Sequence, residues 1–261
     1  MASGDTINLG RPCKVCIDPG HGGRDSGCAH FGVQEKDLNL AICLRLKSLL
    51  EARGHTVFLT RTGDTYVELT DRGRYSVAKG SELFVSVHHD SADAARRGCS
   101  SFVRYPEYRN GMDLGTQLTT ALDAEFQHGF AYGTKCQKHW INLGVLRGGN
   151  NDGLVTATVV ECACLSSRQD FEFIRQAGYY DRAAEALLRG IHRHLGLPVD
   201  AEEPEPEAKY TLVGIDGVVR LGPWMGQDGH GYAAVALCAE SAGVNVSWDG
   251  SKRQWTFSPK T

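Results

Sequence analysis

Four separated residues of this chain have side chains that could together carry out metal-dependent hydrolysis: His21, Glu35, His88 and Glu161. Two histidines and a glutamate can bind one zinc ion and leave a coordination position open for water. A second glutamate can then accept and return protons during the reaction. None of these residues is decisive alone, but the ordered set predicts a zinc hydrolase.

Each of these residues also has an ordinary structural interpretation. His21 could be a loop histidine beside a turn, and Glu35 could be an acid that favours the dipole of a helix in its first turn. Glu161 could be a salt-bridged acid, although a carboxylate at the end of an apolar strand is costly to bury without a partner or a cation. His88 and His89 are neighbours on a predicted strand and point in opposite directions, so only one should face the site. We choose His88 and keep His89 as the alternative ligand.

Short apolar runs that alternate with segments of helical spacing predict the elements that position these residues. Strands are expected at residues 15–18, 55–60, 83–87, 101–105 and 156–161. Helices are expected at about residues 36–53, 67–79, 110–127 and 168–195. This alternation predicts an α/β domain with a mostly parallel, twisted sheet and helices on both faces.

The order of the elements also predicts where the four residues meet. His21 and His88 follow the ends of predicted strands, and Glu161 closes another strand. In open α/β sheets, sites form beyond the carboxyl ends of the strands, so we expect these side chains to converge there. Asp18, which precedes His21, is expected to form the turn or to support a ligand by hydrogen bonding.

The composition of the chain limits its class. With 261 residues, of which 41% are hydrophobic, it fits one large domain plus a small one. A net charge of -3 predicts no nucleic-acid partner, and the absence of an apolar run of about 18 residues predicts no membrane insertion. The polar start lacks a signal-peptide pattern, so we expect synthesis in the cytoplasm unless a leader precedes this sequence. The nine scattered cysteines are expected to be free thiols.

A short acidic segment divides the chain. Residues 199–208 contain five acids, two prolines and no base, which predicts an extended linker. We therefore predict a catalytic domain at residues 1–198 and a small α+β module at 209–261. In that module a helix is expected at 232–242, and a hairpin at 244–248 and 254–257.

Five separated motifs resemble, in order, the zinc-dependent N-acetylmuramoyl-L-alanine amidases of the Amidase_3 type. They are DPGHGG at 18–23, EKD at 35–37, TR at 60–61, SVHH at 86–89 and VECACLSS at 160–167. The resemblance covers about residues 13–195 and implies that His21, Glu35 and His88 bind one zinc ion per catalytic domain, with Glu161 as the catalytic carboxylate. The sequence departs from the family pattern at residues 89–90, 163–164 and 167, which affects the expected substrate contacts.

Four further residues are candidates for substrate binding: His89, Asp90, Arg61 and Arg72. His89 and Asp90 directly follow the third expected ligand, so they could line the cleft or contact the substrate. The two arginines lie beside predicted elements of the same domain. They could instead pair with acids inside the protein.

The resemblance implies that a monomeric enzyme cleaves the amide bond between N-acetylmuramic acid and L-alanine in peptidoglycan. Residues 209–261 resemble, more weakly, the stalk-like module named after the amino terminus of copper amine oxidases, and we expect them to bind or position the enzyme on the cell wall. Such an enzyme without a leader resembles a phage endolysin, and a bacterial autolysin is the close rival. A non-catalytic wall-binding protein and a zinc peptidase acting within the stem peptide are the remaining alternatives.

Overall fold

The computed structural model describes residues 10–92, 96–104, 111–131, 135–139, 143–146, 155–199, 244–249 and 254–259. The chain divides into two compact units, Met1–Asp200 and Ala201–Thr261. Nearly all of the expected linker, and the helix expected at 232–242, lie outside the described residues. The assignment of a wall-binding role to the second unit therefore stays a prediction.

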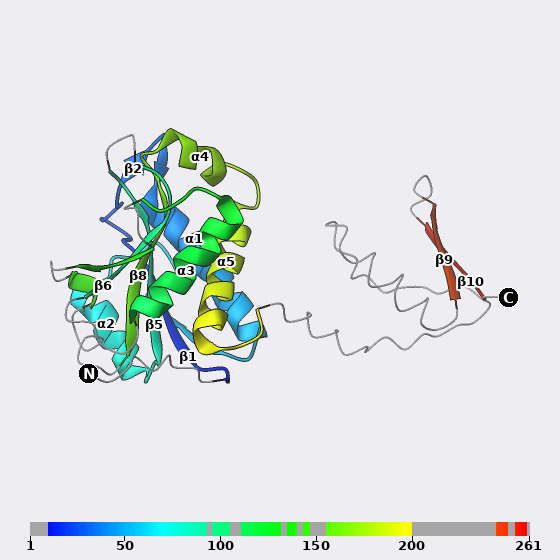
Figure 1. Cartoon of the computed structure of the whole chain (residues 1–261), viewed down its shortest axis with the longest axis horizontal. Coiled ribbons are helices and arrows are strands. Elements are labelled where there is room, and N and C mark those ends of the chain that lie inside the picture. Colours follow the sequence, from blue (N-terminus) through cyan, green and yellow to red (C-terminus); the bar gives the residue numbers. More distant parts are fainter. Residues whose placement is uncertain are drawn as a thin grey trace. The chain divides into compact units, whose positions relative to one another are not determined.

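The first unit is built on a six-stranded sheet with the strand order β4-β1-β5-β8-β6-β7 (Figure 1). The first four strands in that order are mutually parallel, whereas β6 runs antiparallel to β8 and parallel to β7. This arrangement confirms the expected mostly parallel sheet. The strands are β1 (Lys14–Pro19), β4 (Thr56–Leu59), β5 (Leu83–Asp90), β6 (Ser100–Arg104), β7 (Cys136–His139) and β8 (Thr156–Cys164).

Helices cover both faces of this sheet, as predicted. One face packs against α1 (Glu35–Ala52), α3 (Gly111–Phe126) and α5 (Tyr179–Leu195). The other face packs against α2 (Leu69–Ala78) and the short 3-10 helix η1 (Gly144–Leu146). Successive residues of a strand point to opposite faces. Val15 and Ile17 of β1 accordingly join the first core, and Cys16 joins the second.

The helix expected at residues 168–195 is two helices. The chain forms α4 (Arg168–Ile174), leaves the helix, and resumes it in α5. Gly178 directly precedes α5 with a φ of 82°, a left-handed conformation that interrupts a continuous helix. The apolar spacing continues on both sides of this break, so the sequence pattern alone did not reveal it.

A small hairpin that the sequence did not predict leads directly into α1. It consists of β2 (Ala29–His30) and β3 (Val33–Gln34), which pair antiparallel. Phe31 and Gly32 form its turn with φ values of 53° and 81°, and positive values at both central residues are typical of tight hairpin turns. In the second unit, β9 (Val244–Asp249) and β10 (Gln254–Pro259) form another antiparallel pair.

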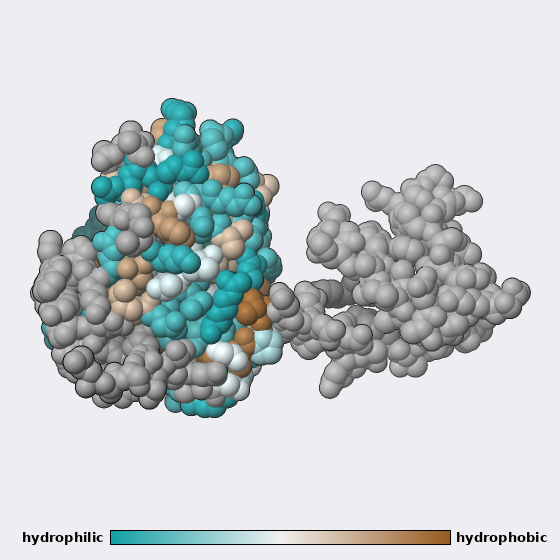
Figure 2. All heavy atoms as spheres, viewed as in Figure 1, coloured by the Kyte–Doolittle hydropathy of each residue, from teal (hydrophilic) through white to brown (hydrophobic). Residues whose placement is uncertain are grey.

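The surface and the cysteines follow from this packing. On the face shown in Figure 2, hydrophilic residues cover most of the described surface, and hydrophobic residues form small separate areas. In the described ranges, no helix is both long and apolar enough to cross a membrane. All eight cysteines in these ranges are free thiols, and seven of them are buried.

Candidate active site

Three of the predicted residues meet at the carboxyl edge of the sheet. His21 comes from the loop after β1, Glu35 from the first turn of α1, and His88 from the end of β5. Their potential ligand atoms all lie within 4.8 Å of one another. The Glu35 carboxylate lies between the two imidazoles, 3.1 Å from His21 Nε2 and 2.9 Å from His88 Nδ1.

Two glycines provide the space in which these side chains come together. A Cβ atom at Gly20 would lie 2.2 Å from Cε1 of His88, and one at Gly27 would lie 2.5 Å from Oε2 of Glu35. Both distances are far below contact distance, so a larger residue at either position would displace a member of the cluster. The glycine-rich loop is therefore required for close packing as well as for its turn.

Two buried arginines fix the path of the loop that carries His21. Arg61 donates hydrogen bonds to the carbonyl oxygens of Pro19 and Gly20, each at 2.9 Å. Arg72 donates to the carbonyl oxygens of Pro19 and His21, again at 2.9 Å. Arg72 also forms a buried ion pair with Asp18 at 2.9 Å, and the hydroxyls of two further residues donate to the same carboxylate.

The sequence analysis named Arg61 and Arg72 as candidates for substrate binding. The structure places both side chains inside the protein, against the loop that carries His21. Both side chains are buried, and their donors are bonded to acceptors of the protein itself. In this structure they therefore hold the loop. The sequence also allowed each arginine to pair with an acid inside the protein. Arg72 does so with Asp18.

His89 is also buried, and it points away from the cluster that contains His88. Its Nδ1 lies 2.9 Å from Oδ1 of Asn39, and its Nε2 lies 2.8 Å from the hydroxyl of Tyr179. The side-chain amide of Asn39 donates in turn to Glu35 at 3.2 Å. Both ring nitrogens of His89 are therefore bonded inside the protein. His89 supports Glu35 indirectly, through Asn39, on the side away from His88.

Two supporting groups of the site were missed by the sequence analysis. The Asp25 carboxylate lies 2.9 Å from Nδ1 of His21, on the opposite side of the ring from Glu35. The backbone N–H of Cys28 donates to Glu35 at 3.0 Å. A carboxylate on the outer nitrogen of an imidazole fixes the ring and makes its inner nitrogen a better metal ligand. The only available signal was that Asp25 follows His21 by four residues.

Glu161 lies directly beside the cluster. It is on β8 in register with His88 of β5, and adjacent residues of parallel strands present their side chains to the same face. Its Oε2 atom is buried and has no hydrogen-bond partner among the described residues. Asp90, another candidate substrate contact, lies at the end of β5 and is partly exposed.

The charges of the site are strongly coupled. Burial alone would raise the pKa of Glu35, but hydrogen bonds from His21 and His88 hold it below its ordinary range. Burial opposes charge on His21 as well, yet Glu35 and Asp25 raise the pKa of this imidazole. Burial raises the pKa of Glu161 well above its ordinary value, and Glu35 and Asp90 raise it further. The cluster therefore carries concentrated negative charge that favours a cation or a proton.

This donor set fits a zinc ion. Two imidazole nitrogens and one buried carboxylate are the ligand types of three-ligand catalytic zinc sites. The unpartnered oxygen of Glu161 lies next to the set without being required as a ligand. The arrangement can therefore bind a metal at one side and move a proton at the other.

Most of the first unit matches one family of known proteins. The family pattern described as N-acetylmuramoyl-L-alanine amidase matches residues 15–193. The endolysin of Bacillus phage SPP1 is 32% identical over 185 residues, which cover 70% of this chain and 66% of the endolysin. The sporulation-specific N-acetylmuramoyl-L-alanine amidase of Bacillus subtilis is 30% identical over 189 residues, covering 70% of this chain and 69% of that protein.

Solved structures show the same fold. An N-acetylmuramoyl-L-alanine amidase from Clostridium difficile 630 superposes with a TM-score of 0.62 at 26% identity, covering 71% of this chain and 98% of that one. The amidase AmiC2 of Nostoc punctiforme gives a TM-score of 0.61 at 29% identity, covering 70% of this chain and 97% of that one.

Proposed function

This chain belongs to the N-acetylmuramoyl-L-alanine amidase family, and we propose that it cleaves the amide bond between N-acetylmuramic acid and L-alanine in peptidoglycan. We also propose that it does so with a zinc ion held by His21, Glu35 and His88. The observation that carries the proposal is the convergence of these three ligand atoms within 4.8 Å. The partnerless oxygen of Glu161 beside them supports it.

Each residue has a distinct part in this reaction. When bound, zinc supplies Lewis acidity toward a carbonyl oxygen and makes water more acidic. Glu161 takes the proton from the attacking water and returns it to the departing amine. Its buried position suits this task, because burial raises its pKa and so strengthens its hold on a proton. Asp25 keeps Nδ1 of His21 engaged, so that Nε2 faces the ligand cluster.

The biological role that we propose is digestion of the cell wall, either for lysis or for remodelling. The relatives include a phage endolysin and a sporulation-specific amidase, and these represent the two settings. The chain spans about two thirds of the length of each. Asp90 remains our candidate for a direct substrate contact, because it is partly exposed next to Glu161.

Mass spectrometry of products released from purified peptidoglycan tests this function. The protein is assayed as isolated, after chelation, and after zinc is restored. We expect zinc-dependent release of intact stem peptides that begin with a free L-alanine amino group. Fragments cut within the stem would identify a peptidase instead. Binding to walls without release, in preparations from several bacteria, would identify a non-catalytic wall-binding protein.

Substitutions separate the metal from the proton carrier. Glu161→Gln should keep its zinc, as measured by elemental analysis, and lose roughly 100-fold or more in turnover. His21→Ala should lose zinc itself. Glu185→Gln, at an exposed position of α5, is the matched control and should resemble the natural protein. Normal wall digestion by Glu161→Gln would refute the catalytic assignment.

A further inference from the structure

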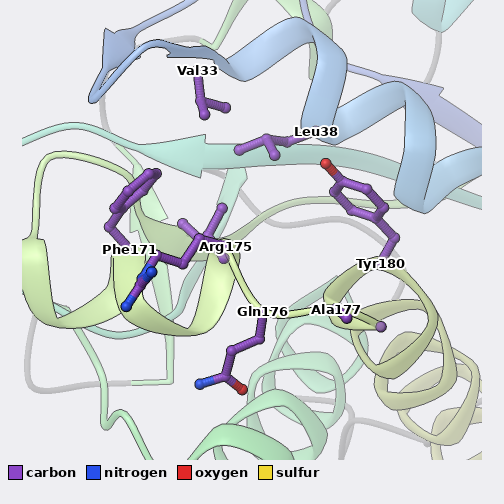
Figure 3. Close-up of a pocket in the computed structure, with 9 residues that line it drawn as sticks. Val33, Leu38, Phe171, Arg175, Gln176, Ala177 and Tyr180 are labelled. Carbon is purple, nitrogen blue, oxygen red and sulfur yellow. The ribbon is translucent and has the colours of Figure 1, made fainter.

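A pocket of about 390 Å³ lies between β3, α1, α4 and α5. This volume is at the lower end of the range for ligand sites and suits one or two small rings. Figure 3 shows Val33 and Leu38 on one side, Phe171 of α4 and Arg175, which follows α4, on a second, and Tyr180 of α5 on a third. The remaining lining residues are Ile174, Gln176, Ala177 and Gly178.

The walls of this pocket continue directly from the elements that hold the candidate active site. Val33 and Leu38 lie on either side of Glu35 in the sequence, at the start of β3 and in the first turn of α1. The helix α4 follows β8, the strand that carries Glu161. Tyr180 follows Tyr179, whose hydroxyl is bonded to His89 behind the cluster. The pocket and the candidate active site are therefore built on the same elements.

The pocket has a mixed apolar and polar lining that includes two aromatic residues. Phe171 and Tyr180 both line it, and Tyr180 is 44% exposed. Phe31, which is 42% exposed at the tip of the β2–β3 hairpin, packs on Phe171 with a centroid distance of 4.7 Å. The guanidinium of Arg168 lies 5.0 Å from the Phe31 ring. Exposed aromatic faces of this kind suit the apolar C–H faces of a sugar ring and the methyl of an acetyl group.

The charges at the rim favour a neutral ligand. Arg175 lines the pocket, but its guanidinium is paired with Glu172 at 2.6 Å. The amide oxygen of Gln176 accepts from Arg182 at 3.4 Å. Among the described residues, the side-chain nitrogen of Gln176 and the hydroxyl of Tyr180 have no hydrogen-bond partner. Both can therefore bond to hydroxyl or amide groups of an uncharged ligand.

We propose that this pocket binds an N-acetylated amino sugar of the glycan strand, adjacent to the sugar that carries the scissile amide. The proposal rests on the proposed amidase function, because that function makes a glycan polymer the substrate. The stem peptide is disfavoured as the occupant, since it carries free carboxylates and Arg175 at the rim is already paired with Glu172.

Binding is tested first with the intact Glu161→Gln protein and N,N′-diacetylchitobiose, followed by NMR. The disaccharide should shift backbone amides of residues 174–180. Tyr180→Ala should bind it about tenfold more weakly, the factor that a loss of about 1.4 kcal/mol produces. Gln176→Ala, at an exposed position, is the second variant and should also weaken binding. Tyr75→Ala removes an exposed ring from α2 on the other face of the sheet and should change nothing.

Kinetics give a second, independent readout. In the active enzyme, Tyr180→Ala should raise KM about tenfold on glycan fragments of several sugars and leave kcat unchanged. A substrate with a single N-acetylmuramoyl unit should not distinguish this variant from the natural protein. Unchanged disaccharide binding in both variants, or shifts of residues 174–180 by a free stem peptide in place of the sugar, would overturn the assignment. If the disaccharide binds but the natural protein hydrolyses no peptidoglycan, the proposed amidase function is refuted and the sugar site remains.

Discussion

A pair of buried histidines, remote from the candidate active site, should make the stability of the first unit depend on pH. His55 accepts a hydrogen bond at Nδ1 from the backbone N–H of Cys13, at 3.2 Å. Its Nε2 must therefore carry the proton, which it donates to Nε2 of His192 at 3.2 Å. Nδ1 of His192 then donates to the carbonyl of Pro198 at 2.7 Å. This chain of bonds requires both imidazoles to be neutral.

The cost of protonation follows from this arrangement. Burial, and secondarily His192, lowers the pKa of His55 from 6.5 to about 4. The unfolded chain therefore binds a proton at His55 between these values, whereas the folded chain does not. The contribution of His55 to the free energy of unfolding is therefore complete above about pH 6.5 and is lost as the pH falls toward 4. At about 1.4 kcal/mol for each pH unit, the full loss is about 3 kcal/mol.

Urea unfolding followed by circular dichroism between pH 7.5 and 4.5 measures this loss. In His55→Asn the amide oxygen can replace Nδ1 as acceptor, but the side chain cannot be protonated. We expect the variant to be about 1 kcal/mol less stable at pH 7.5, because the bond to His192 is lost. It should then lose clearly less stability than the natural protein on acidification.

The control is His30→Asn, which replaces a histidine that is bonded to Ser91. The free energy of unfolding of each variant is subtracted from that of the natural protein at each pH. This difference removes the contribution of the histidines in the candidate metal site, since all three proteins contain them. The reasoning would be refuted if His55→Asn and the natural protein lost stability in parallel over the whole pH range.

Three further predictions concern other parts of the fold. Asp25→Ala should weaken zinc binding about 10- to 100-fold in competition with a chelating dye, because the outer nitrogen of His21 loses its partner. Arg72→Met should destabilise the protein by about 3–5 kcal/mol in urea unfolding, because it leaves the Asp18 carboxylate buried without its cation. Gly115→Ala should cost about 1–3 kcal/mol by the same assay, since its Cβ would lie 2.5 Å from a side chain of β6. Gly63→Ala, where a Cβ meets nothing within 4 Å, should be close to neutral.

The sequence was sufficient for the sheet and for most of the helices because both depend on local patterns. Apolar strands that alternate with helical spacing predicted a mostly parallel sheet, and the structure confirms it. The antiparallel β6 and the edge strand β7 depend on which segments pair, and pairing is not a local property. The break before α5 depends on Gly178, one residue with a positive φ inside an unbroken apolar pattern.

The supporting residues of the site were harder to predict for the same reason. The alternation of side chains on a strand led us to expect that His88 and His89 would face opposite ways. It gave no indication that His89 would be bonded to Asn39 and Tyr179. Arginine donors can reach a substrate, an acid or a backbone carbonyl, and the sequence does not distinguish these acceptors. Only the fold shows that Arg61 donates to the carbonyls of the loop.

These two arginines explain how a glycine-rich loop can hold His21, a candidate metal ligand, in place. Glycine gives the loop its path but also makes it costly to order. His21 itself has a φ of 61°, which is unfavourable for a residue with a side chain. Buried guanidinium groups offset both costs, because they bind three successive carbonyls of residues 19–21. The two buried arginines therefore fix the position of His21 in the candidate metal site, as a site that must hold its ligands within a fraction of an ångström requires.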